Sequence, residues 1–535
     1  MPTVPNPFSF NRQDLVLIMP QLQLVLFGLG ILLIDFWMDA KSKYMNAVLA
    51  LLGTVFSGYA LSRLYIQLSV RAEMGEQGGG LAGFHNTIFL DPFAIFFSAL
   101  FLAATALVAL LSVKYLEIEE EHHGEYYALM LFACAGMMFM ASGNDLVVLF
   151  LGLETMAISF YVLTGFLRRE RRSNEAAVKY MLLGAFSSGI LAYGFSLLYG
   201  IGASTNIQAI GSRLAERMRL MDILKMGQLS GVQGEQIRHS LEAQLPGIWQ
   251  QDPFLWQVLP MLAFVTVAAG LFFKVAAAPF HQWAPDVYEG APTPIAAYVS
   301  VASKAASFAL MVRIFVAVFG STHAQWLYVV AAVAVASLTI GNLAAITQTN
   351  VKRLLAYSSI AHSGYILLGL AAGSAVGLQG MAYYLMVYLF MTAGAFALVI
   401  VLRRKGLIGD ELEDLNGLYQ RSPAAAVLLL IFMLSLAGIP PTAGFMAKYY
   451  ILQALINTQH PVLAVIAALY IVPALYYYFR VVVHAWMKSP GDAPAPVMSL
   501  GQMVAVTVAV FVTLAAGVYP EPFAQLARFA FSIGR

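Results

Sequence analysis

The sequence has almost no cysteine, and this shortage excludes several kinds of site. Cys134 is the single cysteine among 535 residues. One thiolate cannot hold an iron–sulfur cluster or a thiolate zinc site, because both need several such ligands. No strand-bound GxGxxG and no GxxxxGK(S/T) pattern occurs, so nucleotide binding has no support in the sequence. No basic cluster alternates with stacking aromatic residues, which argues against a nucleic-acid partner.

Charge is also scarce, since charged residues make up 11% of the chain and hydrophobic residues 60%. An ordinary soluble domain carries about 25% charged residues. A soluble globule of this composition would expose large apolar patches, so the composition predicts a protein whose solvent is the bilayer. The first apolar run, 15–37, follows no basic stretch and precedes no clear small-residue cleavage site. We therefore expect a retained membrane anchor there and not a signal peptide.

Apolar runs long enough to cross a membrane recur along the whole chain. Their length and the lack of β-barrel alternation predict an all-α polytopic membrane protein with about 14 transmembrane helices. The run 424–456 would be roughly 50 Å long as one straight helix, against an apolar core of about 30 Å. Because Pro440 and Pro441 interrupt it, we expect two half-helices there. The predicted spans are 15–37, 44–66, 88–113, 125–142, 145–166, 176–200, 256–279, 295–318, 324–346, 354–372, 378–402, 424–456, 462–486 and 500–519.

Basic residues are unevenly divided between the two ends of these spans. We call the face that the chain reaches after its first span side A. Most loop lysines and arginines fall on side A, which the positive-inside rule predicts to be cytoplasmic, with both termini on the outer face. The long loop 201–255 on the other side carries several basic residues and weakens this asymmetry. Side-A residues include Lys41, Lys43, Lys114, Arg168, Arg169, Arg171, Arg172, Lys352, Arg353 and Arg403.

A few charged residues remain inside the predicted spans. A charge at the bilayer centre costs about 2.5–3.5 kcal/mol on insertion scales. Arg313 and Arg480 lie near span ends, where a long side chain can reach the interface. Structural ion pairs between helices would account for some of the others, but the lysines outnumber the one deep carboxylate. The deeper group consists of Lys274, Lys304 and Lys448, which we call the lysine row, together with Glu154 and, three residues into its span, Lys179.

Two of the spans are interrupted by proline, and each of them carries a member of the lysine row. Pro279 and Pro285 follow Lys274 in the seventh span, and Lys448 follows the prolines of the twelfth. The two spans are five apart, and an odd offset reverses topology, so spans 4–8 and 9–13 are expected to be inverted repeats. Broken helices at matching places in inverted halves point to a transport site.

Lysines in such surroundings suit proton transfer better than metal binding. Desolvation favours the neutral amine and a nearby carboxylate favours the ammonium, so the proton can be gained or lost as the surroundings change. Glu154 paired with Lys179 could then set the charge state seen by Lys274. His281 could bridge toward Lys304, because an imidazole passes protons through its two nitrogens. Sodium would need several oxygen ligands, often carboxylates, and Glu154 is alone at depth.

His362 lies in the middle of a span with Ser358, Ser359 and Tyr365 nearby. It is either a further proton carrier or a hydrogen-bonded core histidine, and the sequence does not separate the two readings. Asp286 and Glu289, in the broken segment, are expected to fix that loop.

Five stretches, in this order, resemble the antiporter-like membrane subunits of respiratory complex I, the proton-pumping NADH:quinone oxidoreductase, and within them the subunit N type. The resemblance covers nearly the whole chain and implies fourteen helices with two inverted five-helix bundles. The stretches are FLGLETMAISFYVLTGF, EAAVKYMLLGAFSSGILAYG, FFKVAAAPFHQWAPDVYEGAPTP, VKRLLAYSSIAHSGY and LAGIPPTAGFMAKYY.

The resemblance also implies roles, partners and a location. Glu154 and Lys179 would be a modulating pair, Lys274 and Lys304 central proton carriers with His281 between them, and Lys448 the carrier toward the outlet or a neighbouring subunit. The chain itself would carry no cofactor, and NAD, FMN, iron–sulfur clusters and quinone would be bound by other subunits. The partners would be other complex I membrane subunits, sister antiporter-like subunits among them, and membrane lipid, in the bacterial inner membrane.

The predicted organisation comprises four parts and one insertion. The 201–255 loop is longer than the family pattern, and it has amphipathic character around 213–226. The parts are a three-helix segment 1–113, a first repeat 125–318, a second repeat 324–486 and a terminal helix 500–519.

Two other functions remain open: a subunit of a multisubunit cation/proton antiporter or membrane-bound hydrogenase, and a membrane scaffold whose charges only tie helices together.

Overall fold

The structure is a computed structural model, and it describes residues 12–39, 42–74, 79–227, 253–403, 409–490 and 495–532. Within them nearly all regular structure is helical, apart from one short hairpin formed by β1 (Leu81–Gly83) and β2 (Ile88–Leu90). The longer helices are α1 (Arg12–Leu17), α2 (Met19–Asp35), α3 (Met45–Glu73), α4 (Pro92–Glu119), α5 (Gly124–Ser142), α6 (Leu146–Thr164), α7 (Arg171–Gly202), α8 (Ile207–Gly227), α11 (Pro253–Lys274), α12 (Trp283–Gly290), α13 (Thr293–Tyr298), α14 (Lys304–Ala317), α15 (His323–Ile346), α16 (Val351–Ala371), α17 (Ala375–Leu402), α19 (Pro423–Ala437), α20 (Ala443–Asn457), α21 (Pro461–Leu469), α22 (Ile471–Met487), α23 (Leu500–Val518) and α24 (Glu521–Ala530).

The predicted membrane spans are confirmed. Among the described residues, 11 helical segments are long and apolar enough to cross a membrane, and three shorter apolar helices occupy the other predicted positions. Each predicted span overlaps one of these fourteen segments, and the span 424–456 is covered by the segment Pro423–Ala437 together with α20. At the start of the predicted span 88–113, residues 88–90 form β2 instead of helix, and α4 begins only at Pro92, where Asp91 caps it by accepting from the amide of Ala94.

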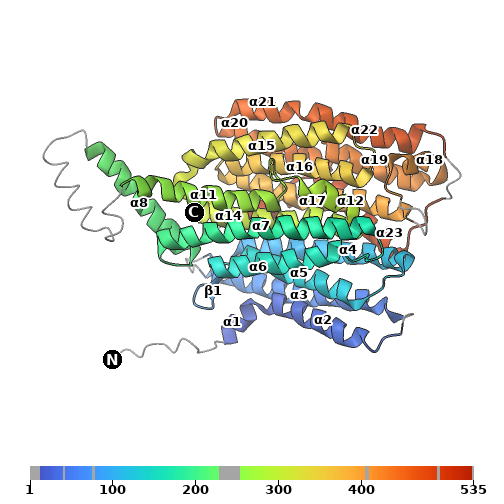
Figure 1. Ribbon diagram of the computed structural model, residues 1–535, viewed down its shortest axis with the longest axis horizontal. Coiled ribbons are helices and arrows are strands. Elements are labelled where there is room, and N and C mark those ends of the chain that lie inside the picture. Colours follow the sequence, from blue (N-terminus) through green and yellow to red (C-terminus); the bar gives the residue numbers. More distant parts are fainter. Residues whose placement is uncertain are drawn as a thin grey trace.

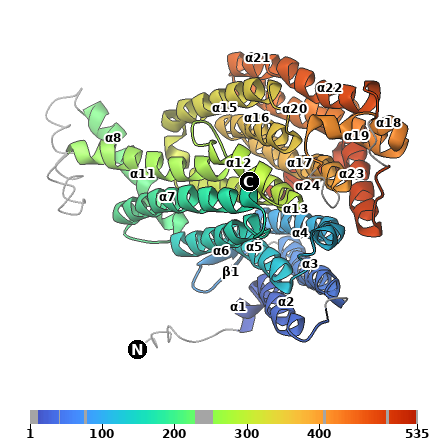
Figure 2. The same cartoon turned by 45° about the vertical axis from the view of Figure 1, so that its right-hand side comes forward.

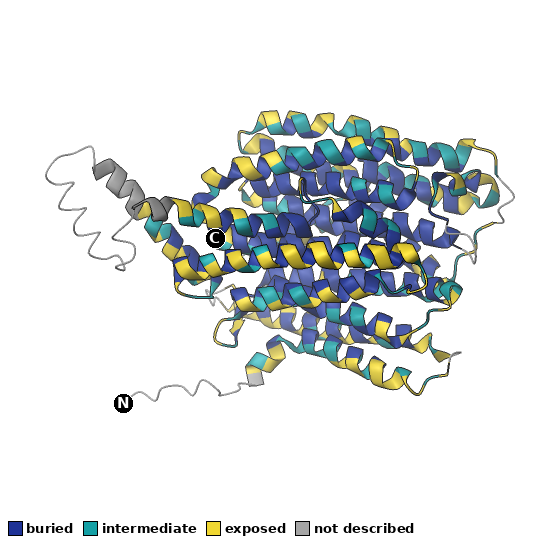
Figure 3. Cartoon of the chain, in the orientation of Figure 1, coloured by how far each residue is buried: buried dark blue, intermediate teal, exposed yellow. Residues whose placement is uncertain are grey.

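The spans lie side by side, with the first and the penultimate span at opposite edges (Figure 1). In the turned view α2 and α3 still form one edge and α21 and α22 the other (Figure 2). The central helices, such as α16 and α17, are almost wholly buried, whereas α2 and α7 expose a long face (Figure 3). The exposed faces are apolar, as at Leu33 and Phe186, which suits contact with lipid or with other membrane proteins.

The first interruption begins within the predicted seventh span, 256–279. α11 ends at Lys274, the chain runs through non-helical residues 275–282, and α12 resumes the helix at Trp283. The next span is also irregular, because a π-helical turn, η2 (Val299–Ser303), joins α13 to α14 just before Lys304. Such turns occur frequently at functional sites. The seventh span is therefore discontinuous, as predicted.

The second interruption divides the twelfth span into α19 and α20 at residues 438–442. Gly438 ends α19 with a φ of 86°, a left-handed conformation that glycine adopts at little cost. The two halves stay joined, because the Ser435 hydroxyl accepts a hydrogen bond from the amide of Gly444 at 3.1 Å. The predicted break at Pro440–Pro441 is thus present. The inverted relation of the two sets of five spans stays a prediction.

The predicted insertion is partly described. Residues 207–227 form α8, which projects beyond one end of the helical body and packs its first turns near α7 and α14 (Figure 1). The segment 213–226, for which the sequence shows amphipathic character, lies within this helix. Residues 228–252 of the 201–255 loop lie outside the described residues.

Side A is held together by an ion-pair cluster around Arg403, directly after α17. Its guanidinium donates to both carboxylate oxygens of Glu119, at 2.6 and 3.0 Å, and to Glu170 at 2.6 Å. Burial alone lowers the pKa of an arginine, but these carboxylates raise the pKa of Arg403 above its ordinary value. Arg403 lies in a side-A loop, as predicted, but it is only 8% exposed there. The cluster joins the ends of α4, α17 and the loop before α7.

We expect Arg403→Gln to destabilise the folded chain by about 3 kcal/mol, because it leaves Glu119, whose side chain is 13% exposed, without its cation. Thermal unfolding in detergent should show a clear drop in midpoint temperature. Lys114→Gln is the matched control, because Lys114 pairs with Glu117 on the exposed surface and such pairs contribute about 0–1 kcal/mol. Equal midpoints for both variants would contradict the structural role of the cluster.

Candidate functional site

Lys448 lies on α20 and reaches back across the second break. It is 3% exposed, and its ammonium nitrogen donates to the carbonyl oxygens of Ala437 at 2.7 Å and Leu436 at 3.3 Å. These carbonyls belong to the last turn of α19 and have no helical partner, because the helix ends there. The helix dipole also places negative charge at this end. The break therefore supplies the acceptors that a buried lysine needs.

The ring of Tyr365 on α16 covers the other side of Lys448, with its centroid 5.1 Å from the nitrogen. An aromatic face attracts a cation without offering a carboxylate. Lys448 is thus bonded to neutral groups only, as far as the described residues show.

Lys304 begins α14, immediately after the π-helical turn, and is 2% exposed. Its nitrogen donates to the carbonyl oxygen and the hydroxyl of Ser359, at 2.7 and 2.5 Å, and to the hydroxyl of Ser363 at 3.0 Å. Both serines lie on α16, four residues apart, and so share one helix face. Tyr388 on α17 adds a hydroxyl that donates to Ser359 at 2.8 Å.

Lys274 is the last residue of α11 and is 4% exposed. Its nitrogen donates to the hydroxyl of Tyr161 on α6 at 3.3 Å. Glu154, two turns earlier on α6, acts electrostatically on both Lys274 and Tyr161. The Oε1 atom of Glu154 is buried and has no hydrogen-bond partner. The carboxylate thus influences Lys274 through space without a direct bond.

Lys179 does not pair with Glu154 in the structure, so the expected direct pair was wrong. Lys179 instead donates to Asp286 at 2.8 Å and lies 2.9 Å from Glu175, one turn earlier on α7. Its side chain is 43% exposed, because it lies on the outer face of α7. Asp286 belongs to α12, so this pair ties the broken segment to α7.

A second basic residue completes the attachment of α12. Arg353 on α16 donates to Asp286 at 2.7 Å and to Glu289 at 2.9 Å. The two carboxylates therefore fix the broken segment between α7 and α16, in keeping with the role expected for them.

His281 lies in the non-helical stretch after Lys274 and is half-buried. Its Nδ1 atom is buried without a hydrogen-bond partner, and the partners of Lys304 are Ser359 and Ser363. The expected bridge from His281 to Lys304 is therefore not formed in this structure. Ser363, which accepts from Lys304, also donates its hydroxyl to the backbone carbonyl of Val275, the residue after Lys274, at 2.8 Å.

His362 is buried on α16, and both of its ring nitrogens have partners. Nδ1 lies 2.6 Å from the hydroxyl of Tyr384, and Nε2 lies 3.1 Å from that of Tyr478. Lys304 and Lys448 both act on the ring electrostatically. His362 therefore lies within electrostatic range of two members of the lysine row.

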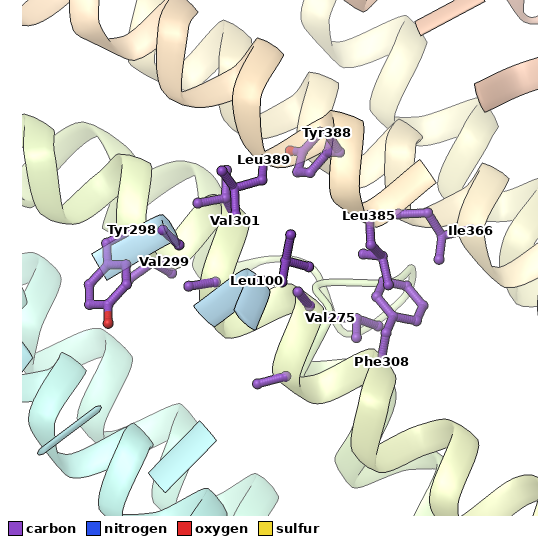
Figure 4. Packing of buried hydrophobic residues seen from close by; sticks show 14 of the residues in the cluster. Leu100, Val275, Tyr298, Val299, Val301, Phe308, Ile366, Leu385, Tyr388 and Leu389 are labelled. Atoms are coloured by element: carbon purple, nitrogen blue, oxygen red, sulfur yellow. The ribbon is translucent and has the colours of Figure 1, made fainter. Parts of the chain in front are cut away.

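The lysine row is enclosed by dense apolar packing. Val275 and Phe308 meet Leu385 and Ile366 beside the first break (Figure 4). All four side chains are buried and lie on different elements. Polar groups in such surroundings interact strongly, because little solvent screens them.

Besides Arg403, Lys352 is a buried cation that the sequence did not indicate. Lys352, counted among the side-A loop residues, is 4% exposed, and its nitrogen donates to the carbonyls of Glu289 and Ala291 at 2.6 and 2.8 Å. Asn350 caps α16 through the amides of Lys352 and Arg353, so the first turn of α16 begins earlier than the predicted span. The cap pattern Asn-x-Lys-Arg was the available signal.

These features together match one known family. A family model for the transmembrane region of NADH:quinone oxidoreductase and Mrp antiporter subunits matches residues 143–472. The chain belongs to this family. The resemblance carried by the five sequence stretches is thereby confirmed, and the chain has the fold of an antiporter-like membrane subunit.

Relatives of this antiporter-like chain cover its whole length. NADH-quinone oxidoreductase subunit N 2 of Solibacter usitatus is 48% identical over 97% of this chain and 98% of its own length. Subunit N 1 of Koribacter versatilis is 46% identical over 100% of this chain and 98% of its own length. A chain in the respiratory complex I of Thermus thermophilus with bound aureothin has a TM-score of 0.73 at 29% identity, covering 95% of this chain and 100% of the matched one.

A chain of the Mrp complex from Dietzia also matches, with a TM-score of 0.73 at 20% identity, over 96% of this chain and 97% of the matched one. At this identity the likeness concerns the fold. Within the described part of this antiporter-like chain, no group of three or more His, Cys, Asp or Glu residues could hold a metal ion.

Proposed function

We propose that the chain is a proton-translocating membrane subunit of a bacterial NADH-quinone oxidoreductase. The observation that carries this proposal is the state of the lysine row: three buried lysines, each hydrogen-bonded to neutral oxygen atoms of the described residues. A structural ion pair would place a carboxylate against each ammonium. Lysines held by hydroxyls and carbonyls can lose a proton without leaving an unpaired buried anion.

The chemistry of the row follows from its acceptors. A carbonyl or hydroxyl oxygen accepts a hydrogen bond from both the ammonium and the neutral amine, so the geometry serves both protonation states. Lys274, Lys304 and Lys448 would carry protons in turn, with Ser359, Ser363 and His362 between them. An ionised Glu154 would attract an ammonium at Lys274, on which it acts through space.

Lys179 and His281 act at the edge of this path in our proposal. Lys179 would move between Asp286 and Glu154, and its approach to Glu154 would weaken the hold of that carboxylate on Lys274. His281, whose Nδ1 lacks a partner, would take a proton when the first break rearranges.

The proton path would run through two repeated halves of the chain. Residues 125–318 and 324–486 would form two inverted repeats, each containing one of the broken spans, and segments 1–113 and 500–519 would flank them. Side A would be cytoplasmic and both termini would face the outside of the inner membrane.

Electron transfer would take place in other subunits, which would bind NAD, FMN, iron–sulfur clusters and quinone. The partners would be the other membrane subunits of the complex, including sister antiporter-like subunits, and lipid. The exposed apolar face of α7, with Val178, Leu182 and Phe186, supports contacts of this kind. Energy from quinone reduction would reach the chain as changes in charge pairing.

A cation/proton antiporter subunit is the alternative that the fold allows. Sodium transport would be expected to use several oxygen ligands, often carboxylates. Among the described residues, one carboxylate, the half-buried Glu154, acts electrostatically on Lys274, while the lysine row itself consists of three buried cations. This composition favours protons.

Lys274→Met tests the proposal. We expect the assembled complex to lose on the order of 10²-fold in proton pumping, because a proton carrier is replaced by an apolar side chain of similar length. Pumping is followed in inverted membrane vesicles with NADH and a pH-sensitive dye, and assembly by native gel electrophoresis. Lys114→Met, on the exposed surface, is the control. An assembled Lys274→Met complex that pumps at the unmodified rate would support the scaffold function and contradict ours.

A further inference from the structure

A groove lies between α2 and α3 at the end of the molecule opposite side A. It has a volume of about 670 Å³, and it is bounded by the beginning of α2 and the second half of α3. These two helices form one edge of the helical body (Figures 1 and 2). None of the three lysines of the lysine row lines the groove, so the proposed proton path does not account for it.

The polar half of the groove comes from one face of α3. Tyr59, Arg63, Gln67 and Arg71 follow one another at intervals of four residues, so they share a helix face, and all four are exposed and line the groove. Arg63 donates to the hydroxyl of Tyr59 at 3.3 Å, which engages one of the five N–H groups of a guanidinium. Among the described residues that line the groove none is acidic, and Glu73, near the end of α3, is not one of them. The groove therefore presents two guanidinium groups to an anion.

Toward side A the same face of α3 is apolar. Val55 and Leu52 continue the helical spacing from Tyr59, and both are exposed. On α2, the exposed residues Leu26 and Leu33 follow Met19, a groove residue, at intervals of seven and lie on its face. Exposed side chains of this kind suit hydrocarbon better than water. The surface thus has a cationic end and an apolar length.

This change of character occurs at the depth where a bilayer also changes. α3 has 29 residues, and a helix of that length spans about 44 Å, against an apolar core of about 30 Å. The exposed Trp37 and Tyr44, just before the first residue of α3, are typical of the interface on side A. Counted from Met45, Arg63 lies about 27 Å along the helix, near the far boundary of the core, and Arg71 lies about 12 Å beyond it.

Other arginines at this end of the molecule are neutralised within the chain. Arg313 donates to both carboxylate oxygens of Asp91, at 2.7 and 2.6 Å, and Arg528 pairs with Glu521. The bond of Arg63 goes instead to a neutral phenol. The groove therefore differs from its surroundings in having a cation whose bonded partner carries no opposite charge.

We propose that this surface, which we call the lipid groove, binds one anionic phospholipid in the leaflet opposite side A. The phosphate lies at the level of Gln67, midway between Arg63 and Arg71, which both reach it with their long side chains. The acyl chains lie along Val55 and Leu26 toward the centre of the bilayer. A guanidinium matches the geometry of phosphate oxygens and binds them in pairs.

The charges on the page favour an anionic lipid over the two other possible occupants. A zwitterionic lipid would bring its own cation to a groove that already holds two arginines. A helix of another subunit would have to cover both the apolar length and the cationic end. An anionic phospholipid matches both parts with one molecule. This site does not depend on the proposed function, because it concerns an edge of the molecule that carries no proton.

Photo-cross-linking in the complete complex tests the lipid groove. The complex is reconstituted into phosphatidylcholine vesicles that contain a small, non-saturating share of either phosphatidylglycerol or phosphatidylcholine with the same photoactivatable acyl chain. Labelled peptides of α2 and α3 are quantified by mass spectrometry, relative to labelled peptides of the exposed face of α7. We expect the phosphatidylglycerol probe to label α2 and α3 preferentially and the phosphatidylcholine probe to show no such preference.

The variant Arg63→Gln/Arg71→Gln should reduce the preferential labelling about 25-fold. An arginine near a membrane surface strengthens the binding of anionic lipid by about fivefold, and two of them multiply to that value. Arg528→Gln, which removes an exposed arginine from the same end of the molecule, is the matched control and should be labelled as the unmodified chain is. Gln67→Glu is an independent variant: it keeps both arginines but puts a carboxylate between them, so labelling should fall at least about fivefold.

Three results would overturn the lipid groove. Equal labelling of α2 and α3 by both probes means ordinary contact with bulk lipid. No labelling by either probe means that another subunit covers this edge. Unchanged phosphatidylglycerol labelling in the double variant and in Gln67→Glu means that the arginines do not select the lipid. If the double variant fails to assemble, Gln67→Glu decides. Pumping by Lys274→Met is measured separately, so the failure of one proposal leaves the other standing.

Discussion

Replacing Lys448 with methionine is expected to reduce proton pumping by on the order of 10²-fold while the complex still assembles. The side chain of methionine fills the same space next to Tyr365 but cannot hold a proton. The carbonyls of Leu436 and Ala437, which now accept from the ammonium, would lose a donor. Because Lys448 lies at the end of the row, we also expect coupled NADH:quinone turnover to fall.

Lys448→Arg separates charge from proton transfer in the same experiment. An arginine keeps the positive charge near the end of α19, but it does not lose its proton in proteins. If Lys448 only neutralised the helix end, the arginine variant would pump normally. We expect it to be nearly as inactive as Lys448→Met, and normal pumping would contradict the carrier role. Lys488→Met, a substitution outside the spans, serves as the control for assembly.

The spans and the two breaks could be predicted because their signals are local. Length and apolar composition determine a membrane helix, and two consecutive prolines at 440 and 441 disrupt the interior of a helix. The lysine row could also be predicted, since a buried charge is visible against an apolar background. These features depend on neighbours within a few positions in the sequence.

The partners of the row could not be predicted, because they depend on how each helix is rotated about its axis. A helix such as α17 is apolar on all sides, so its sequence does not show which face turns inward. The expected pair of Glu154 and Lys179 failed for this reason: α7 is rotated so that Lys179 meets Asp286 on α12. Ser363 and Tyr478 became visible only when helices distant in sequence were brought together.

The burial of Lys352 and Arg403, at the ends of helices, could not be predicted either. Both were counted among the loop residues of side A, and the sequence pattern of basic residues next to a span is the same for an exposed and a buried side chain. Their burial results from carboxylates and carbonyls supplied by other segments, Glu119 and Glu170 for Arg403 and the end of α12 for Lys352. The positive-inside pattern therefore also contains residues that hold the helix ends together.

Gly438→Ala is expected to inactivate pumping and to destabilise the second break, although only one methyl group is added. Gly438 has a φ of 86°, and a left-handed conformation costs an L-residue about 1–2 kcal/mol. A Cβ atom there would lie 2.8 Å from Cδ and 3.0 Å from Nζ of Lys448. The methyl group would therefore push the lysine away from the carbonyls of α19.

The matched control is Gly30→Ala in α2, where an added Cβ meets no atom within 4 Å. In a regular helix, alanine is also preferred over glycine, so this variant should be as stable as the unmodified chain or slightly more stable. Pumping and thermal unfolding of both variants are measured in the assembled complex. We expect Gly438→Ala to lose pumping even under conditions in which it is fully assembled, because the carbonyls of Ala437 and Leu436 hold Lys448 only while the break keeps its shape. A fully active, normally stable Gly438→Ala complex would show that the geometry of the break is not needed to hold the cation.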